Sequence, residues 1–138
     1  MIKLDDLRLV SYAIPATKRA TTGVSATVDM TDCHEIMVIH AHGKDTNSSN
    51  VLLRHATSTN TFASATAFGT AVAGALATSA CQAFVIRNQP SIKRYLIIKL
   101  SATAASSNNG VLVLGFRNRA VPYSATLGSF SAVTVCTV

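Results

Sequence analysis

His40 and His42 come nearest, in type and spacing, to the ligands of a metal site. Residues two apart on a β-strand point to the same face, so these two imidazole rings could bind one ion. Asp45 or His55 would have to supply the third ligand. The chain has no Glu after Glu35 and no His after His55, which leaves few ligands for such a site. We therefore expect no metal, and we keep His40, His42 and His55 as the alternative.

No motif for covalent catalysis or phosphate binding is present. The chain lacks G-x-S-x-G, and its seven glycines form neither a P-loop nor a dinucleotide-binding loop. Cys33 and His34 are adjacent, and neighbours on one strand point to opposite faces, so they cannot share the hydrogen bond of a Cys/His pair. With Cys81 and Cys136, Cys33 makes three widely spaced cysteines, which indicate free thiols in a reducing compartment. We expect a non-enzymatic protein without a cofactor.

Charge is scarce and unevenly distributed. The 138 residues include 12 Lys and Arg against 6 Asp and Glu, a formal net charge of +6, and charged residues make up 13% of the chain. All the acidic residues precede residue 46, so residues 46–138 carry only positive charge. This excess indicates a face for an acidic partner. Because the basic residues are scattered and not interleaved with aromatic ones, we expect that partner to be a protein and not a nucleic acid.

The sequence predicts neither export nor membrane insertion. Asp5 and Asp6 stand where a signal peptide needs basic residues followed by an apolar run. The most apolar stretch, 71–86, is too short to span a bilayer. Alanine, serine and threonine fill more than a third of the chain. A surface of such small neutral side chains suits a protein that packs against its neighbours.

Strand patterns dominate the sequence, and helical periodicity is absent apart from an ambiguous alanine-rich stretch at 63–80. Short β-branched and aromatic segments alternate with turn residues, at spacings typical of a sandwich or barrel. The predicted strands are Leu7–Ala13, Gly23–Met30, Glu35–His42, Val51–His55, Gln82–Arg87, Lys93–Ser101, Val111–Phe116 and Phe130–Val138. We expect an all-β single domain over residues 1–138, with residues 56–80 as a long loop arm.

Asn108-Asn109-Gly110 predicts a hairpin turn between the runs at 95–100 and 111–114. Both runs are apolar nearly throughout, which is typical of central strands buried on both faces or covered by another subunit. Antiparallel pairing would join the start of one run to the end of the other. A patch of arginine and tyrosine, a composition typical of interface anchors, would result. Its members are Lys93, Arg94, Tyr95, Arg117, Arg119 and Tyr123.

Three segments together resemble a known family of phage proteins. Lys93–Leu100 reads Lys-Arg-Tyr-Leu-Ile-Ile-Lys-Leu, Ser106–Gly110 is a Ser/Asn/Gly turn, and Val111–Pro122 ends in Gly-x-Arg-x-x-x-x-Pro. This pattern is similar to the small head-decoration, or cement, proteins of tailed bacteriophages, especially the jelly-roll cement proteins of short-tailed phages. Asp5–Val10, followed by a polar strand, fits the same proteins more loosely. In all, the resemblance covers about a third of the chain, and its motif is structural, not catalytic. The alanine-rich stretch 63–80 departs from the charged loops expected in such proteins.

The resemblance implies a jelly-roll β-sandwich of about eight antiparallel strands that self-associates as a homodimer, with a trimer as the other possibility. Such a protein is made in the host cytoplasm, sits on the outside of an HK97-type head, and clamps neighbouring major capsid proteins. The Lys93 to Tyr123 patch then supplies the capsid contacts. Two alternatives stay open. One is a cupin-like metal-binding β-sandwich, and the other is a minor virion protein of the tail or of a head-fibre base.

Overall fold

The computed structural model describes residues 7–19, 24–43, 49–59, 61–68, 73–76, 80–87, 90–102, 107–116 and 132–136. These residues form strands and one short 3-10 turn, and they contain no helix long and apolar enough to cross a membrane. The strands are β1 (Leu7–Arg19), β2 (Val24–Asp29), β3 (Glu35–His42), β4 (Ser49–Ala56), β5 (Thr66–Ala67), β6 (Ala73–Leu76), β7 (Ala80–Arg87), β8 (Tyr95–Ala102), β9 (Ser107–Phe116) and β10 (Ala132–Cys136), with the turn η2 at Phe62–Ser64. Seven of the eight predicted segments contain one of these strands or lie within it, and the eighth, Lys93–Ser101, overlaps β8.

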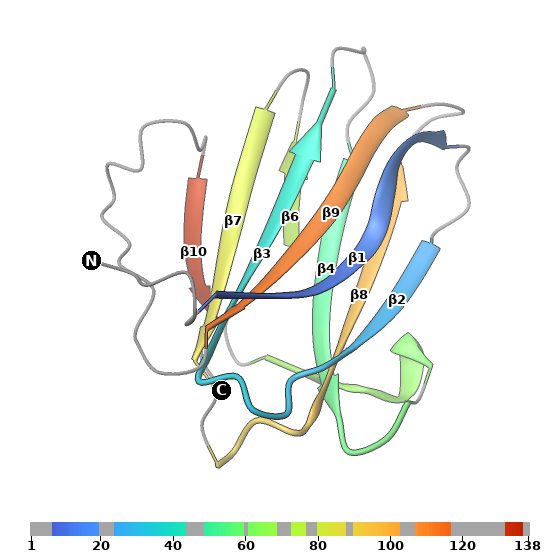
Figure 1. The fold of residues 1–138 in the computed structure, drawn as a ribbon. Helices are drawn as coiled ribbons and strands as arrows, with labels where there is room; N and C mark the ends of the chain where they lie inside the picture. The colour runs from blue at the N-terminus through green and yellow to red at the C-terminus, as the bar shows by residue number, and fades with distance from the viewer. Residues whose placement is uncertain are drawn as a thin grey trace.

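The strands form two sheets that face each other (Figure 1). One sheet has the order β1-β9-β3-β7-β10, and the other has β2-β8-β4-β5, with β6 also paired to β4. The pairs β1:β9, β2:β8, β3:β7 and β4:β6 are all antiparallel. Each successive strand from β1 to β4 thus pairs with a strand that comes earlier in the second half of the chain, as in a long hairpin. A ladder of this kind folded into two sheets is a jelly roll. The predicted all-β sandwich is confirmed.

Two edge strands show local departures from a regular antiparallel sheet. β10 runs parallel to β7, with Ala132 opposite Gln82 and Cys136 opposite Ile86, whereas the prediction had only antiparallel strands. β1, at the other edge of the same sheet, contains Pro15 and pairs with β9 in an irregular register. Proline lacks a backbone donor and is tolerated at such an edge. Both edge strands cover hydrogen-bonding groups of the strands beside them.

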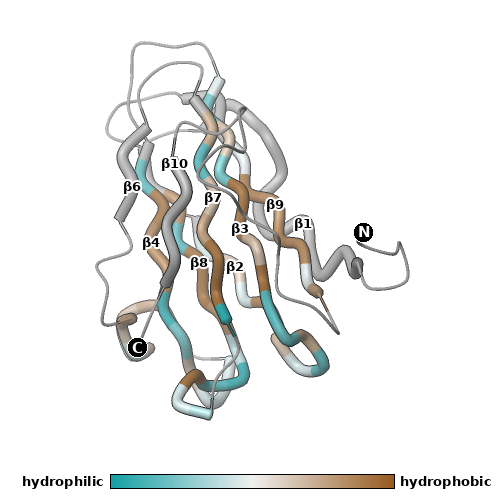
Figure 2. The backbone as a smooth tube through the Cα atoms, turned by 90° about the vertical axis from the view of Figure 1, so that its left-hand side faces the viewer, coloured by the Kyte–Doolittle hydropathy of each residue, from teal (hydrophilic) through white to brown (hydrophobic). Residues whose placement is uncertain are grey.

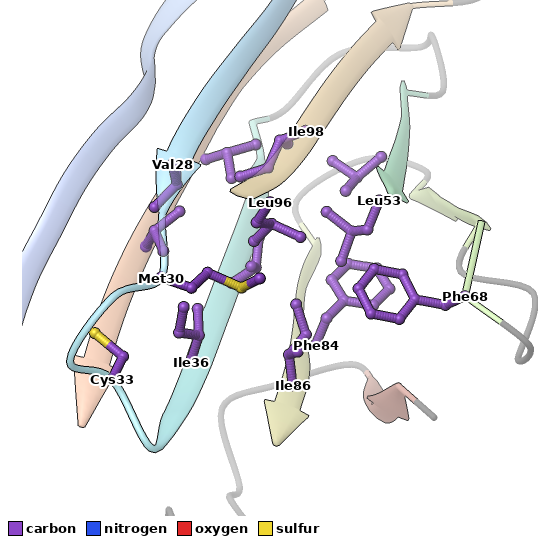
Figure 3. Close-up of a cluster of buried hydrophobic side chains, with 14 of the residues drawn as sticks. Val28, Met30, Cys33, Ile36, Leu53, Phe68, Phe84, Ile86, Leu96 and Ile98 are labelled. Carbon is purple, nitrogen blue, oxygen red and sulfur yellow. The ribbon is translucent and has the colours of Figure 1, made fainter. Parts of the chain in front are cut away.

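The main core lies between the two sheets, where alternate side chains of each strand meet. Figure 2 shows hydrophobic residues running along β3, β4, β7, β8 and β9, and Figure 3 shows side chains from both sheets directed into the space between them. The cluster comprises Val28, Met30, Cys33, Ile36, Val38, Val51, Leu53, Phe68, Phe84, Ile86, Ile92, Leu96, Ile98, Leu100, Val111 and Val113. The two sheets are thereby held together by apolar burial.

The outer faces of β8 and β9 also carry buried apolar residues, as their sequences predict. On β8, Ile97 is 1% exposed and packs with Ala56, Ala65 and the half-buried Phe62 of η2. The cover of β8 therefore comes from the chain itself. On the outer face of the other sheet, Phe116 of β9 belongs to a separate cluster with Met37, Ala83 and Val85, and Ile39 and Leu114 pack against it.

The predicted hairpin between β8 and β9 is wrong. β8 pairs with β2 and β4, whereas β9 pairs with β1 and β3. Asn108, Asn109 and Gly110 lie within β9 instead of forming a turn. Two strands that are apolar on both faces can each occupy the centre of a different sheet. Leu96 of β8 and Val113 of β9 then join one core cluster between the sheets.

The predicted loop arm at 56–80 contains more regular structure than a loop. η2, β5 and β6 all fall within it, and both short strands pair with β4. β5 aligns Thr66 with His55 near the end of β4, and β6 aligns Leu76 with Ser49 at its start. The alanine-rich stretch thus extends the sheet of β2, β8 and β4.

Replacing a large side chain at the centre of the core tests this packing. Phe84 is 2% exposed, so Phe84→Ala leaves a cavity between the sheets. We expect the free energy of unfolding to fall by about 3–5 kcal/mol in urea denaturation. Thr27→Ala, at an exposed position of β2, should change it by no more than about 0.5 kcal/mol. A cost below about 1 kcal/mol for Phe84→Ala would contradict the described core.

Candidate interaction surface

The turn between β2 and β3, residues 30–34, joins the two sheets at one end of the sandwich. The backbone N–H of Met30 donates to the carbonyl of Arg94, just before β8, at 2.9 Å. The N–H of His34 donates to the carbonyl of Phe116, at the end of β9, at 2.7 Å. Asp32 has a φ of 66° there, a left-handed conformation that aspartate tolerates better than most residues. The start of β8 and the end of β9 therefore lie at the same end, although the two strands do not pair.

Arg94 is held by a carboxylate of its own chain. Its Nε lies 3.0 and 3.1 Å from the two carboxylate oxygens of Asp29, and its Nη2 lies 2.6 Å from Oδ2. Thr31 also donates to Asp29 through its N–H at 3.0 Å and its hydroxyl at 2.6 Å. The Arg94 hydrogen bonds, followed by those from Thr31, hold the pKa of Asp29 well below its usual value. Arg94 is thus a neutralised cation, and its guanidinium lies 5.1 Å from the ring centre of Tyr95.

Lys93 is exposed and is anchored by a neutral partner. Its ammonium donates to the Thr66 hydroxyl at 2.7 Å, and its backbone N–H donates to Nδ1 of His55 at 3.1 Å. Lys93, Arg94 and Tyr95 follow one another in the chain, but the Lys93 ammonium contacts β5 and the Arg94 guanidinium contacts β2, on the other side of β8. Arg117, Arg119 and Tyr123 lie outside the described residues, so the other half of the predicted patch is not placed.

A second group of basic side chains lies on the outer face of the β2-β8-β4 sheet. Nη1 of Arg54 donates to the carbonyl oxygens of Phe62 at 3.0 Å and Ala63 at 3.1 Å. The Arg54 guanidinium lies 4.6 Å from the centre of the Phe62 ring, and the Lys99 ammonium lies 5.7 Å from the same centre. Arg54 pairs with Ile97, two residues before Lys99 on β8, which puts both cations on one face. We call Arg54, Phe62 and Lys99 the cation cluster.

Sequence reasoning did not single out the cation cluster. Arg54 and Lys99 each interrupt an otherwise apolar strand, and this is the signal that marks them in the sequence. A charged residue at an alternating position of a central strand must point to an accessible face. Phe62 carries no comparable signal, because only the position of η2 over the sheet brings its ring close to both Arg54 and Lys99.

Among the described residues, two carboxylates are paired with arginines and the cation cluster has no carboxylate partner. Asp29 pairs with Arg94, and Oε1 of the buried Glu35 lies 3.0 Å from Nε of Arg87. Neither Arg54 nor Lys99 forms an ion pair within this part of the chain. Within the described residues, no carboxylate therefore balances the positive charge of Arg54 and Lys99 on the outer face of the β2-β8-β4 sheet.

His40 and His42 point to the inner face of β3, as their spacing predicts, and both are buried. Nδ1 of His40 lies 3.1 Å from the amide nitrogen of Gln82. Burial, together with the nearby His42, lowers the pKa of His40 to about 4. His40 is therefore neutral at pH 7 and acts as a polar residue of the core.

His55 does not complete a site with these histidines. It lies beside Phe68, with ring centres 4.9 Å apart, one residue before the end of β4, whereas His42 precedes the segment that leads to the start of β4. Burial and the charge of Lys93 lower the pKa of His55, while the backbone of Ala67 raises it. Asp45 lies outside the described residues. Within the described chain, no group of three or more His, Cys, Asp or Glu side chains could hold a metal ion.

The cysteines that the structure describes do not form an activated nucleophile. Cys33 is buried and the adjacent His34 is exposed, and both lie in the turn before β3 instead of in a strand. Cys81 on β7 is half-buried, and burial raises the pKa of its thiol, which disfavours the reactive thiolate.

Comparison of the chain with models of protein families, with curated proteins and with solved structures found no match.

The buried imidazole of His40 makes stability depend on pH. The unfolded chain takes up a proton at His40 near its usual pKa of 6.5, whereas the folded chain does so only near 4. Stability is therefore complete above pH 6.5 and decreases as the pH falls toward 4. His40 should contribute a loss of about 2 kcal/mol between pH 7 and pH 5. In urea denaturation at a series of pH values, His40→Gln should flatten this slope, and an unchanged slope would show that His40 does not cause it.

Proposed function

We propose that this protein is a non-enzymatic capsid decoration protein. It binds the outer surface of an HK97-type phage head and clamps neighbouring major capsid proteins, which stabilises the shell. The observation that carries the proposal is the positive charge of Lys93, Arg54 and Lys99 around the β2-β8-β4 sheet, which no carboxylate of the described residues balances in an ion pair. The resemblance of residues 93–122 to phage cement proteins names the partner, and the jelly-roll strand order agrees with it.

A shell offers many identical binding sites, so each contact can be modest. Multivalent attachment through a homodimer raises the overall affinity without any new kind of contact. Basic side chains that face acidic patches on the shell increase the association rate and set the register of binding. The paired Arg94 contributes less to this attraction, because its charge is balanced by Asp29. Arg94→Glu would also set two carboxylates against each other, so it is a poor test of shell binding.

Immunogold labelling of virions whose genome encodes this chain tests the proposal. Antibodies against the purified protein should label the heads at many positions on each particle. Light scattering of the purified protein should give twice the 14.4 kDa mass of one chain. Binding to heads stripped of the protein should weaken as the salt concentration rises, because salt screens exposed charges. Label confined to tails, or absent from particles, would overturn the proposed function.

A further inference from the structure

We infer that the cation cluster of Arg54, Phe62 and Lys99 is a receptor for an acidic segment of a partner protein, whose Asp or Glu carboxylates bind between the two cations. The inference rests on the proposed function only for the identity of that partner, which is then the major capsid protein. The chemistry of the receptor follows from the geometry of the cluster itself.

Arg54 is preorganised for this role. Nη1 is fixed by the carbonyls of Phe62 and Ala63, and the guanidinium is held against the Phe62 ring. The remaining donors of the guanidinium, on Nε and Nη2, have no hydrogen-bond partner among the described residues. Guanidinium donors arranged in this way fit the two oxygens of a carboxylate. Because the Arg54 side chain is already ordered, ligand binding costs little further side-chain entropy.

Lys99 supplies a second positive charge at a suitable separation. The register of β4 and β8 places Arg54 and Lys99 diagonally on adjacent strands, where Cα atoms are about 7–8 Å apart. Both side chains are half-buried, which removes part of the water that screens an exposed ion pair. The Lys99 ammonium contacts only the Phe62 ring within the described chain, so it remains available to an anion.

Protein carboxylates fit the cluster better than a nucleic acid does. Binding of single strands relies on aromatic rings that stack on bases. The Phe62 ring is approached by both Arg54 and Lys99, and the Tyr95 ring carries Arg94, so these rings already have cationic neighbours. Because Arg94 is paired with Asp29, one fewer unpaired cation is available to contact a phosphate backbone.

A fluorescent oligoglutamate peptide provides a direct probe. Fluorescence anisotropy at low salt should show that the intact protein binds it, and Lys99→Gln should weaken binding by about fivefold or more. Arg54→Lys keeps the positive charge but loses the paired Nε and Nη2 donors of the guanidinium, so it should also weaken binding. Arg8→Gln is the control, because it removes one positive charge from β1, at the edge of the other sheet. It should change binding less than about twofold.

The outcomes separate the receptor from the proposed function. Equal losses for Lys99→Gln and Arg8→Gln in variants with unchanged unfolding midpoints would reduce the effect to net charge and overturn the inference. Binding of an oligothymidylate of equal length, as tight as the peptide and equally sensitive to Lys99→Gln, would overturn it in favour of a phosphate surface. If Lys99→Gln loses the peptide but still decorates stripped heads like the unchanged protein, the receptor stands and its assignment to the shell protein is overturned.

Discussion

The fold depends on the burial of two strands, β8 and β9, that are apolar on both faces. A strand of this kind is stable only where each face is covered, and the centre of a sheet meets that requirement. Placing β8 and β9 at the centres of different sheets lets Leu96, Ile98 and Val113 share one core. On the outer faces, η2 lies over Ile97 of β8, and Phe116 of β9 packs with Met37, Ala83 and Val85 on its own sheet face. The jelly-roll order follows from satisfying all these faces at once.

Polar groups inside and around this sandwich are accommodated in two different ways. Inside, His40 remains neutral beside Gln82, because a charged imidazole between two apolar sheets would lose its hydration. Toward the surface, the carboxylate of Glu35 is compensated by Arg87, and that of Asp29 by Arg94. The second pair also ties the end of β2 to the start of β8. These two carboxylates form their ion pairs with Arg87 and Arg94, so neither of them neutralises Arg54 or Lys99.

The position of η2 links the packing of the fold to its surface chemistry. Phe62 packs against the small cluster that covers Ile97, and its ring also orders the guanidinium of Arg54. An alanine-rich connection in the sequence therefore both covers Ile97 of the central strand β8 and supplies the aromatic ring of the cation cluster.

Two local features of the sequence determined where the strands lie. These are the alternation of apolar side chains and the turn residues between the apolar segments. They also determined that His40 and His42 share a face. The sequence could not determine which strands pair. Asn109-Gly110 favours a local hairpin, but burying both faces of β8 and β9 favours separate sheets, and that long-range burial prevails. Only the tertiary structure decided that Arg94 is neutralised by Asp29, 65 residues away, and that Phe62 joins Arg54 to Lys99, because such contacts depend on where distant segments pack.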